Sequence, residues 1–529
     1  MLSTNTNMVK EVVRHFLPVD AHVEFVDNTA IFEVASEKIN ETVKHIVGHT
    51  TVSLKLITAT DERETDGCFK IWYIFGVPEK NMFIIPFIRV QDGKQFPSVS
   101  SLHNQAYAYE RKIHTFFGLI PSNHHDLRPL ILHENWPSHV FPLRKDVDWQ
   151  TRPEKAHGTY VFQKVEGEGI YEIPVGPIHA GIIEPGHFRF SMAGEEIVHL
   201  EPRLGFTHKG SEKLFEVLPL EKKVRLAEKI SGDSSFSHSL AFCQAVEKLG
   251  SITPPKRALS LRVIFAELER LANHFGDIGA IMTDTGFNFG GAHGSRLREL
   301  IMRINMRLTG SRFLRGVNVI GGVTTDIDSK EKDLVSAELE IVEKDFLEII
   351  EIAEDSTSLL NRLQGTGTLS HKIAKDYGVT GVPAKAVGMS HDARVNFPYA
   401  AYGRLNLQDD NSEKDGDVRA RFRVRIHEVA SSMEIIQKIL RDLPEGPICH
   451  SAAVALKSNS LAVSIVEGWR GEIVYFITTD KSGNISRVAP RDPSFINWTV
   501  LGEVGVGNVV PDFPLINKSF NLSYTGNDL

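Results

Sequence analysis

Two stretches of apolar residues at helical spacing constrain the fold of this chain more than any other feature. In the first, steps of four and three residues put on one helix face Val335, Leu339, Val342, Phe346, Ile349 and Ala353. The second follows Thr253 and two prolines, which suit a helix start, and consists of Leu261, Ile264, Leu268, Leu271, Phe275 and Ile278. Such helices bury one face against other elements, so the sequence predicts a domain with a largely helical core.

Strand-like runs lie on both sides of these helical stretches. Runs of β-branched and aromatic residues between turn residues are typical of strands. Before the helices these runs are residues 69–75, 82–90, 161–175 and 189–200, and after them residues 453–456, 461–466 and 473–477. One helix, residues 106–117, is expected among the first strands. Arg421, Arg423 and Arg425 alternate as on one face of a strand, and we expect them to be surface or interface charges.

A chain of 529 residues exceeds what one hydrophobic core usually supports, so two or more domains are expected. Residues 147–157 are polar and charged, contain Pro153 and show no apolar period, which is typical of a linker. We therefore expect an α+β module over residues 1–146 and a mainly α-helical domain with small β-sheets over residues 158–529.

Charge and cysteine content exclude several classes of protein. The formal net charge of -8 argues against nucleic-acid binding, which needs concentrated Lys and Arg. Residues 1–16 carry polar groups where a signal peptide needs an apolar stretch, and no apolar run is long enough to span a membrane. The three cysteines, Cys68, Cys243 and Cys449, form no CxxC pair and suit a reducing compartment. A cytoplasmic or peripheral protein is expected.

A loop dense in Gly, Pro and His lies between two predicted strands. Residues 176–181 read Gly-Pro-Ile-His-Ala-Gly, and residues 184–188 read Glu-Pro-Gly-His-Phe. Such a loop lets backbone and imidazole groups approach a ligand, although a plain turn would explain the same composition.

Four ordered blocks resemble the large subunit of membrane-bound [NiFe]-hydrogenases and its relative in respiratory complex I. They cover residues 203–213, 245–248, 267–274 and 391–399, and include Glu267, Glu269, Arg270, Asp392 and Arg394. The likeness is strongest to the formate hydrogenlyase and hydrogenase-4 type, in which a complex I-like module comes first. The resemblance implies a hydrogenase-like or complex I-like helical domain.

The first module resembles the small peripheral-arm subunit of complex I. The similar residues are 109–119, 126–128 and 142–146. In the family this module is a docking element, so we expect Glu110, Arg111 and Arg128 to be structural.

The resemblance also shows which residues replace the metal ligands of the family. In [NiFe]-hydrogenases two cysteine pairs hold the metals, and here Ser231 and Ser234 fall at the first pair and Ser523 and Gly526 at the second. A rival placement of the second pair starts at Asp492, but the residues after it resemble the segment that precedes the pair. Serine keeps its proton near neutral pH and lacks the soft sulfur that these metals need. No metal site and no hydrogen activation are expected.

A zinc site and a quinone site are two other possibilities for these residues. Zinc would need His179, His187, His208 and His238 with Asp233, whose spacings match no standard zinc pattern, so histidines without a metal are favoured. In complex I the equivalent cavity holds a quinone between a loop histidine, here His179 or His187, and a tyrosine, which falls near Gly232 and is missing.

The loop resembles the hydrogenase version more closely, in which a glutamate before the Gly-His pair moves protons. Glu184 matches this glutamate. It could form a polar path with His179, His187, Asp233, His238 and Asp392. The alternative, that these are hydrogen-bonded structural groups, has equal weight.

The resemblance thus implies a peripheral subunit on the cytoplasmic side of a membrane complex. Its expected partners are a small subunit with a [4Fe-4S] cluster and the membrane subunits of the complex. This chain would bind no cofactor of its own, with quinone as a candidate acceptor, and would couple electron transfer to quinone or proton movement. The alternatives are a catalytically silent scaffold and a true hydrogenase.

Overall fold

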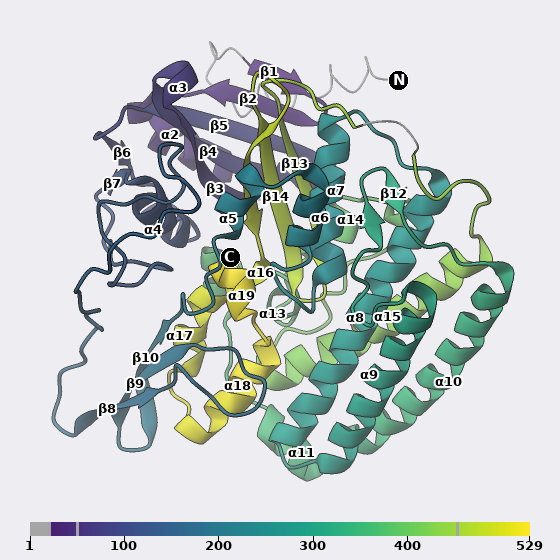
Figure 1. Cartoon of the computed structure of the whole chain (residues 1–529). Coiled ribbons are helices and arrows are strands. Elements are labelled where there is room, and N and C mark those ends of the chain that lie inside the picture. Colours follow the sequence, from purple (N-terminus) through teal and green to yellow (C-terminus); the bar gives the residue numbers. More distant parts are fainter. Residues whose placement is uncertain (1–22, 49–51, 451–453) are drawn as a thin grey trace. The chain divides into compact units, whose positions relative to one another are not determined.

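The computed structural model describes residues 23–48, 52–450 and 454–529, and the chain forms two compact units (Figure 1). The first consists of residues up to 162 with 204–217 and 376–378, and the second of residues 163–203, 218–375 and 379–529. Residues 147–157 contain no helix or strand. The expectation about residues 1–16 concerns a segment outside the described residues.

The first unit is built on a five-stranded sheet with the order β1-β2-β5-β4-β3. β2 and β5 are parallel and the other neighbours antiparallel. The strands are β1 (Val23–Val26), β2 (Thr29–Glu33), β3 (Ser53–Glu62), β4 (Cys68–Val77) and β5 (Met82–Val90). The strands predicted at residues 69–75 and 82–90 are confirmed as β4 and β5.

Helix α4 (Ala106–Phe117) has the predicted bounds and packs on β3. Glu110 accepts hydrogen bonds from Ser98 Oγ (2.5 Å) and Val99 N (2.7 Å), and Arg111 donates to the Arg128 carbonyl. These bonds hold surrounding loops, which supports a structural role for both residues. The remaining elements of this unit are η1 (Ser36–Lys38), α2 (Ile39–Val47), α3 (Arg63–Asp66), η2 (Pro78–Lys80), β6 (Gln95–Pro97), β7 (Ile120–Ser122) and α5 (Ser211–Val217).

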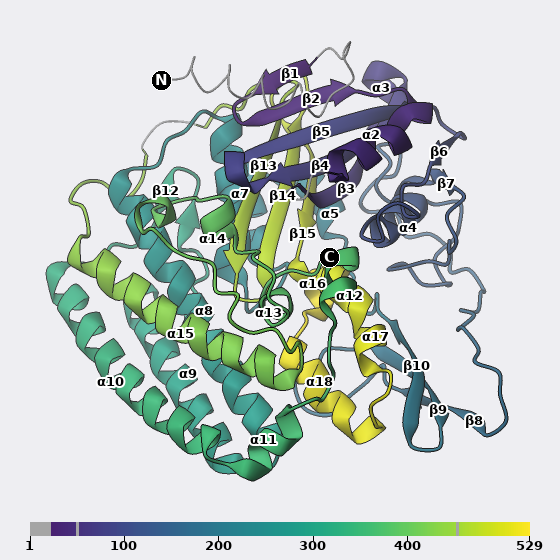
Figure 2. The same ribbon diagram turned by 180° about the vertical axis from the view of Figure 1, so that it is seen from behind.

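Four long helices form the core of the second unit (Figure 2). They are α8 (Lys256–Asp284), α9 (Asn288–Thr309), α10 (Ser329–Glu354) and α15 (Val418–Arg441). α8 packs against α9 and α15, and α10 packs against the same two helices. α8 and α9 approach closely because glycines face each other: a Cβ on Gly294 would lie 2.6 Å from the Gly279 Cα.

The two predicted helical stretches form α10 and α8. The buried residues of α10 are the six predicted ones, and Asp328 caps its start by accepting from Glu331 N. α8 begins directly after Pro255 without a side-chain cap, so Thr253 does not have the predicted capping role. α10 ends at Glu354, and a further helix, α11 (Thr357–Leu363), follows it.

Two three-stranded antiparallel sheets complete the second unit. One contains β8 (Ile170–Val175), β9 (His187–Ala193) and β10 (Glu196–Arg203), and the other β13 (Leu461–Gly468), β14 (Gly471–Thr479) and β15 (Ile485–Arg491). Helix α7 (Ser235–Leu249) packs on β13 and β14. The strands predicted at residues 461–466 and 473–477 are confirmed as parts of β13 and β14.

Several strand predictions are wrong. Only residues 170–175 of the predicted 161–175 form a strand, and the run 189–200 is a hairpin that turns at Gly194. Residues 454–456 form no strand, and residue 453 lies outside the described residues. Arg421, Arg423 and Arg425 belong to helix α15, and Arg421 and Arg425 are buried rather than at the surface. Arg421 and Arg425 are four residues apart and share the buried face of the helix, whereas the Arg423 side chain is 43% exposed on another face.

Short elements connect these parts. They are α6 (Leu220–Ala227), β11 (Asn318–Val319), β12 (Gly322–Val323), α12 (His371–Tyr377), α13 (Val382–Lys385), α14 (Ala393–Asn396), η3 (Tyr402–Arg404), α16 (Pro493–Asn497), η4 (Trp498–Val500), α17 (Leu501–Gly505), η5 (Val510–Asp512), α18 (Phe513–Phe520) and α19 (Tyr524–Asp528). Among the described helices, none combines the length and apolar character needed to cross a membrane.

Candidate functional site

The two segments that we expect at the family's metal-ligand positions meet inside the second unit. Ser231 Oγ donates to Ser523 Oγ at 2.9 Å, although the two residues are 292 positions apart. Ser231 and Ser234 precede α7, and Ser523 caps α19 by accepting from Gly526 N at 2.9 Å. The backbone therefore brings all four positions to one place.

Arg470, at the turn between β13 and β14, lies between these segments. Its Nη1 is 2.6 Å from Asp233 Oδ1 and its Nη2 is 2.7 Å from Oδ2, which makes a two-point ion pair. Nη1 also donates to Ser231 Oγ at 3.3 Å, and Nε donates to the Asn521 carbonyl at 2.5 Å. The guanidinium stacks on the Trp469 ring at 3.9 Å. We call Ser231, Asp233, Arg470 and Ser523 the Arg470 cluster.

The charge of Arg470 keeps Asp233 ionised. Burial acts to raise the pKa of Asp233, but the nearby guanidinium and its hydrogen bonds bring that pKa below its ordinary value. Arg470 is almost fully buried, whereas 34% of the Asp233 side chain is exposed. The cluster thus holds a buried cation whose counter-ion reaches toward solvent.

A second buried pair lies beside the cluster. His238 Nε2 is 2.9 Å from Asp492 Oδ2, and its Nδ1 is 3.1 Å from the Tyr475 hydroxyl. Asp492 also caps α16 by accepting from Ser494 N at 2.7 Å. Burial raises the pKa of Asp492, but the hydrogen bond and charge of His238, with the charge of Arg470, lower it to about 2.

The residues at this site do not fit a nickel–iron centre. Such a centre needs four thiolates, and the four positions are serine or glycine. The Arg470 guanidinium lies within hydrogen-bonding distance of Ser231. A Cβ on Gly526 would lie 2.6 Å from the Asp492 carboxyl carbon. Among the residues that the structure describes, no group of three or more His, Cys, Asp or Glu side chains is placed to hold a metal ion.

The predicted loop lies against the C-terminal segment through Glu184. The Glu184 carboxylate accepts from Thr525 N at 3.1 Å, two residues beyond Ser523. His179 Nε2 donates to the Gly186 carbonyl at 2.7 Å, and His187 Nδ1 lies 3.2 Å from the Gly176 carbonyl. Both histidines therefore hold their own loop together, and burial lowers the pKa of His187.

The structure places the sequence-predicted site residues in three groups. Asp233 and His238 lie at the start of α7 beside Arg470 and Asp492, and Glu184 contacts the turn that follows Ser523. His179 and His187 stay within the loop. Asp392 belongs to a separate buried ion network.

That network joins two of the blocks on which the family resemblance rests. Arg394 binds Asp392 (2.7 Å) and Glu267 (3.1 Å), and Lys385 binds Asp392 (2.7 Å) and Glu428 (2.6 Å). The remaining members are Arg270, His274, Tyr402 and Ser432, which bond Glu267 or Glu428. Three buried cations, Arg270, Lys385 and Arg394, thus balance three buried carboxylates.

Glu467 is a fourth carboxyl group beside this network, and among the residues that the structure describes no ion pair joins it to a cation. It accepts from Ala393 N at 2.9 Å, and burial together with the charge of Asp392 raises its pKa to about 8. For Glu267, by contrast, burial is outweighed by Arg394 and Arg270, and the pKa falls to about 2. Each carboxylate of the network has hydrogen-bond or ion-pair partners, which is typical of a buried network with a structural role.

Sequence reasoning missed Arg470, Tyr475 and the role of Asp492. Arg470 lies in Trp-Arg-Gly at a hairpin turn, a pattern too common to point to a site. In the sequence, Asp492 stands out only as a rival position for the second cysteine pair. In the fold, Asp492 lies against Gly526, so both segments border the same site.

Comparisons with known proteins identify the family of this chain. The family model described as the respiratory-chain NADH dehydrogenase 49 Kd subunit matches residues 284–462 and 454–528, and the 30 Kd subunit model matches residues 32–153. A solved chain of the membrane-bound sulfane sulfur reductase, an archaeal respiratory membrane complex, superposes with a TM-score of 0.65 at 26% identity. That match covers 68% of this chain and 99% of the other.

Two relatives from Escherichia coli K12 match over 482 residues, or 90% of this chain. Formate hydrogenlyase subunit 5 is 30% identical with 84% of its length covered, and hydrogenase-4 component G is 33% identical with 83% covered. The predicted resemblance and fold class are confirmed. The chain therefore belongs to the family of formate hydrogenlyase subunit 5 and hydrogenase-4 component G, with a segment similar to the complex I 30 Kd subunit ahead of one similar to the 49 Kd subunit.

Proposed function

We propose that this chain is a peripheral subunit of a membrane-associated oxidoreductase complex and couples electron transfer to quinone or proton movement without a nickel–iron centre. The observation that carries the proposal is the Arg470 cluster. It replaces the family's metal ligands with hydroxyls and an ion pair, while Asp233 and His238 remain at the site. The family relationship supplies the complex.

The proposed electron donor is a [4Fe-4S] cluster in a small partner subunit, on the cytoplasmic side of the membrane. The loop of residues 176–186 supports a protein partner, because Ile178 is 88% and Ile182 is 97% exposed. Exposed apolar side chains of this size on one loop are typical of an interface. A net charge of -8 gives no support to a nucleic-acid partner.

A test combines metal analysis with electron transfer in the purified complex. We expect no stoichiometric nickel, and electron transfer to a quinone analogue that depends on this chain. Stoichiometric nickel would contradict the metal proposal. Absence of transfer to any acceptor would contradict the redox proposal.

A silent scaffold is the second candidate, and it is favoured by the hydrogen bonds that satisfy Glu184, His179 and Asp233. Glu184→Gln keeps an acceptor for Thr525 N but cannot exchange a proton, and His187→Ala removes an imidazole. A scaffold keeps full activity in both variants, whereas a proton-coupled subunit loses activity in Glu184→Gln. Glu195→Ala, at an exposed hairpin turn, is the control.

A further inference from the structure

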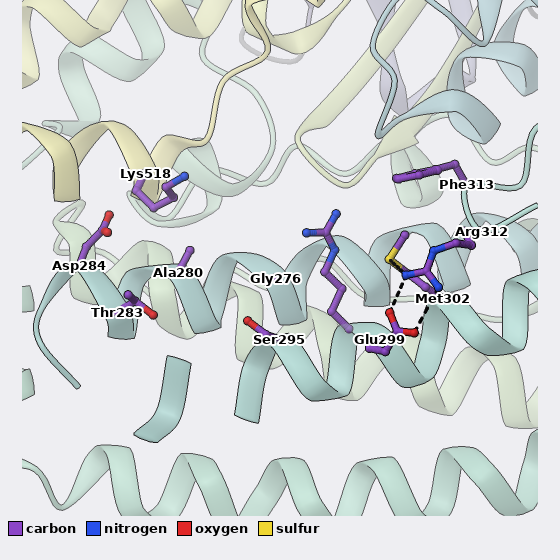
Figure 3. A pocket seen from close by; sticks show the side chains of 11 residues that line it. Gly276, Ala280, Thr283, Asp284, Ser295, Glu299, Met302, Arg312, Phe313 and Lys518 are labelled. Carbon is purple, nitrogen blue, oxygen red and sulfur yellow. Dashed lines mark hydrogen bonds and ion pairs between the residues drawn. The ribbon is translucent and has the colours of Figure 1, made fainter. Parts of the chain in front are cut away.

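An open pocket of about 570 Å³ lies in the second unit between α8, α9 and α18. Its wall includes Gly276, Ala280, Arg298, Glu299, Arg312 and Lys518. Figure 3 shows the ion pair of Arg312 and Glu299 beside Phe313 at one end, and Asp284 and Lys518 at the other. With charged groups on its wall and an open mouth, the pocket is accessible to water.

A smaller cavity continues this pocket into the protein. Arg298, Met302, Arg312 and Phe313 line both spaces. In the smaller cavity, the centre of a water molecule has a volume of about 10 Å³ available, so the cavity holds about one water molecule. Its inner wall consists of Asp233, Glu269, Ala272 and Asn273. The cavity therefore leads from the open pocket to Asp233, which belongs to the Arg470 cluster.

Glu269 is the buried ionisable group on this inner wall that the Arg470 cluster does not use. Its carboxyl accepts from Phe236 N (2.7 Å), Ser237 N (3.0 Å) and Ser237 Oγ (2.5 Å). No cation binds it directly within the described chain. It shares the lining of the cavity with Asp233, Arg298 and Arg312.

The bonding of Glu269 differs from that of the other carboxylates nearby. Asp233 has Arg470 and Asp492 has His238, so both stay ionised. For Glu269, burial raises the pKa most, the three hydrogen bonds lower it, and the charge of Asp233 raises it further, to about 7. Asn273 Nδ2 donates to the Asp233 and Glu269 carbonyls, at 2.9 Å each, and so ties the two segments together.

We propose that the pocket and the small cavity form a proton entrance to the Arg470 cluster, with Glu269 as the residue that exchanges protons with cavity water. The carboxylate takes a proton from a hydronium ion in the cavity, which leaves a neutral water, and becomes a neutral carboxyl. It then gives that proton to the reduced quinone of the proposed function, so the carboxyl O–H bond breaks as the quinol O–H bond forms. This inference rests on the proposed function, because it supplies protons for redox chemistry at that site.

Infrared difference spectra of the purified complex test the exchange without turnover. The wild-type minus Glu269→Gln spectrum should contain a carboxyl band that titrates with a midpoint near pH 7. Transfer to D2O should shift this band quickly. A band that does not titrate between about pH 5 and pH 9, or that resists deuterium exchange, overturns the proposal.

Two alanines on α8 give a matched pair for blocking the route. Ala272→Val fills the small cavity and should slow deuterium exchange of the Glu269 band several-fold, since the water loses its space. Ala280→Val places the same side chain in the open pocket only and should leave the exchange rate unchanged. Equal rates in both variants would overturn the route.

Turnover gives the functional readout. Glu269→Gln should lower proton-coupled electron transfer by about 10²-fold and remove the inflection near pH 7 from its pH profile. The control Glu348→Gln changes an exposed carboxylate of α10 that lines neither the pocket nor the cavity, and should keep both rate and profile. Wild-type turnover in Glu269→Gln overturns the route but leaves the proposed function standing. If the wild-type complex transfers no electrons, the proposed function fails, and the infrared results decide the route alone.

Discussion

Arg470 connects three chain segments through its hydrogen bonds to Asp233, Ser231 and the Asn521 carbonyl. Removing it leaves Asp233 partly buried without its cation. We expect Arg470→Ala to lower the free energy of unfolding by about 3 kcal/mol, less than for a fully buried pair because Asp233 is partly exposed. Chemical denaturation measures this change.

Two controls accompany this prediction. Arg303→Ala removes an arginine whose side chain is 72% exposed and should change stability by less than about 0.5 kcal/mol. Asp233→Asn in the Arg470→Ala background should restore part of the loss, since no unpaired charge remains. A double variant as unstable as the sum of both single variants would show that the ion pair is not the cause.

Gly526 shows how the site excludes a side chain at one of the expected ligand positions. A Cβ there would meet the Asp492 carboxyl at 2.6 Å, although alanine normally favours a helix over glycine. Gly526→Ala should therefore destabilise the chain by about 1–3 kcal/mol in thermal unfolding. Gly403→Ala, whose Cβ would have only an ordinary contact at 3.5 Å, is the control. Equal effects of both changes would contradict the steric account.

The raised pKa of Glu269 also predicts a pH dependence of stability. Between about pH 4.5 and pH 7 the folded chain keeps a proton that the unfolded chain has released, so the free energy of unfolding falls as pH rises. Glu269→Gln removes this term, so its stability relative to wild type should rise by up to about 3 kcal/mol between pH 4.5 and pH 7. Urea unfolding at several pH values gives the difference. A difference that is constant across this window would contradict the raised pKa.

At the scale of elements, α10 gives the sharpest test of burial. Phe346 is 3% exposed and packs edge-on against Phe275 of α8, while its neighbour Leu347 is 57% exposed. Phe346→Ala should cost about 3–5 kcal/mol of unfolding free energy, and Leu347→Ala should cost less than about 0.5 kcal/mol. Similar losses at both positions would mean that another element covers Leu347.

Helices α10 and α15 show what sequence patterns predict well and what they miss. The apolar period of α10 was sufficient because its six buried residues repeat in steps of four and three on one helix face. α15 was misread because Arg421 and Arg425 lie on its buried face. Their partners, Ser519 and Asp277, are 98 and 148 residues away along the chain. Local spacing carries no information about such distant partners.

At the scale of the whole molecule, the exposed isoleucines of the loop of residues 176–186 predict a partner contact. Ile182→Ser should reduce co-purification of the iron–sulfur subunit without changing the melting temperature of the isolated chain. Ile341→Ser, on the surface of α10 and 62% exposed, is the matched control. Unchanged co-purification in Ile182→Ser would place the partner elsewhere.

The candidate site was predictable only in part. The family resemblance led to Ser231, Ser523 and Asp233, because ordered blocks identify segments even when they lie far apart in the chain. The resemblance could not identify Arg470, because the sequence of a hairpin turn does not show which distant helix the turn will contact. The loss of sulfur was readable from the sequence, but the cation that replaced it required the fold.

The guanidinium of Arg470 has a consequence for any attempt to rebuild a hydrogenase. Installing cysteines at positions 231, 234, 523 and 526 would bring new thiolates to a fixed positive charge, which would pair with them in competition with any metal. A side chain at position 526 would still lie too close to the Asp492 carboxylate. Reversal would therefore require redesign of the hairpin turn and of the α16 cap, and not only four ligand replacements.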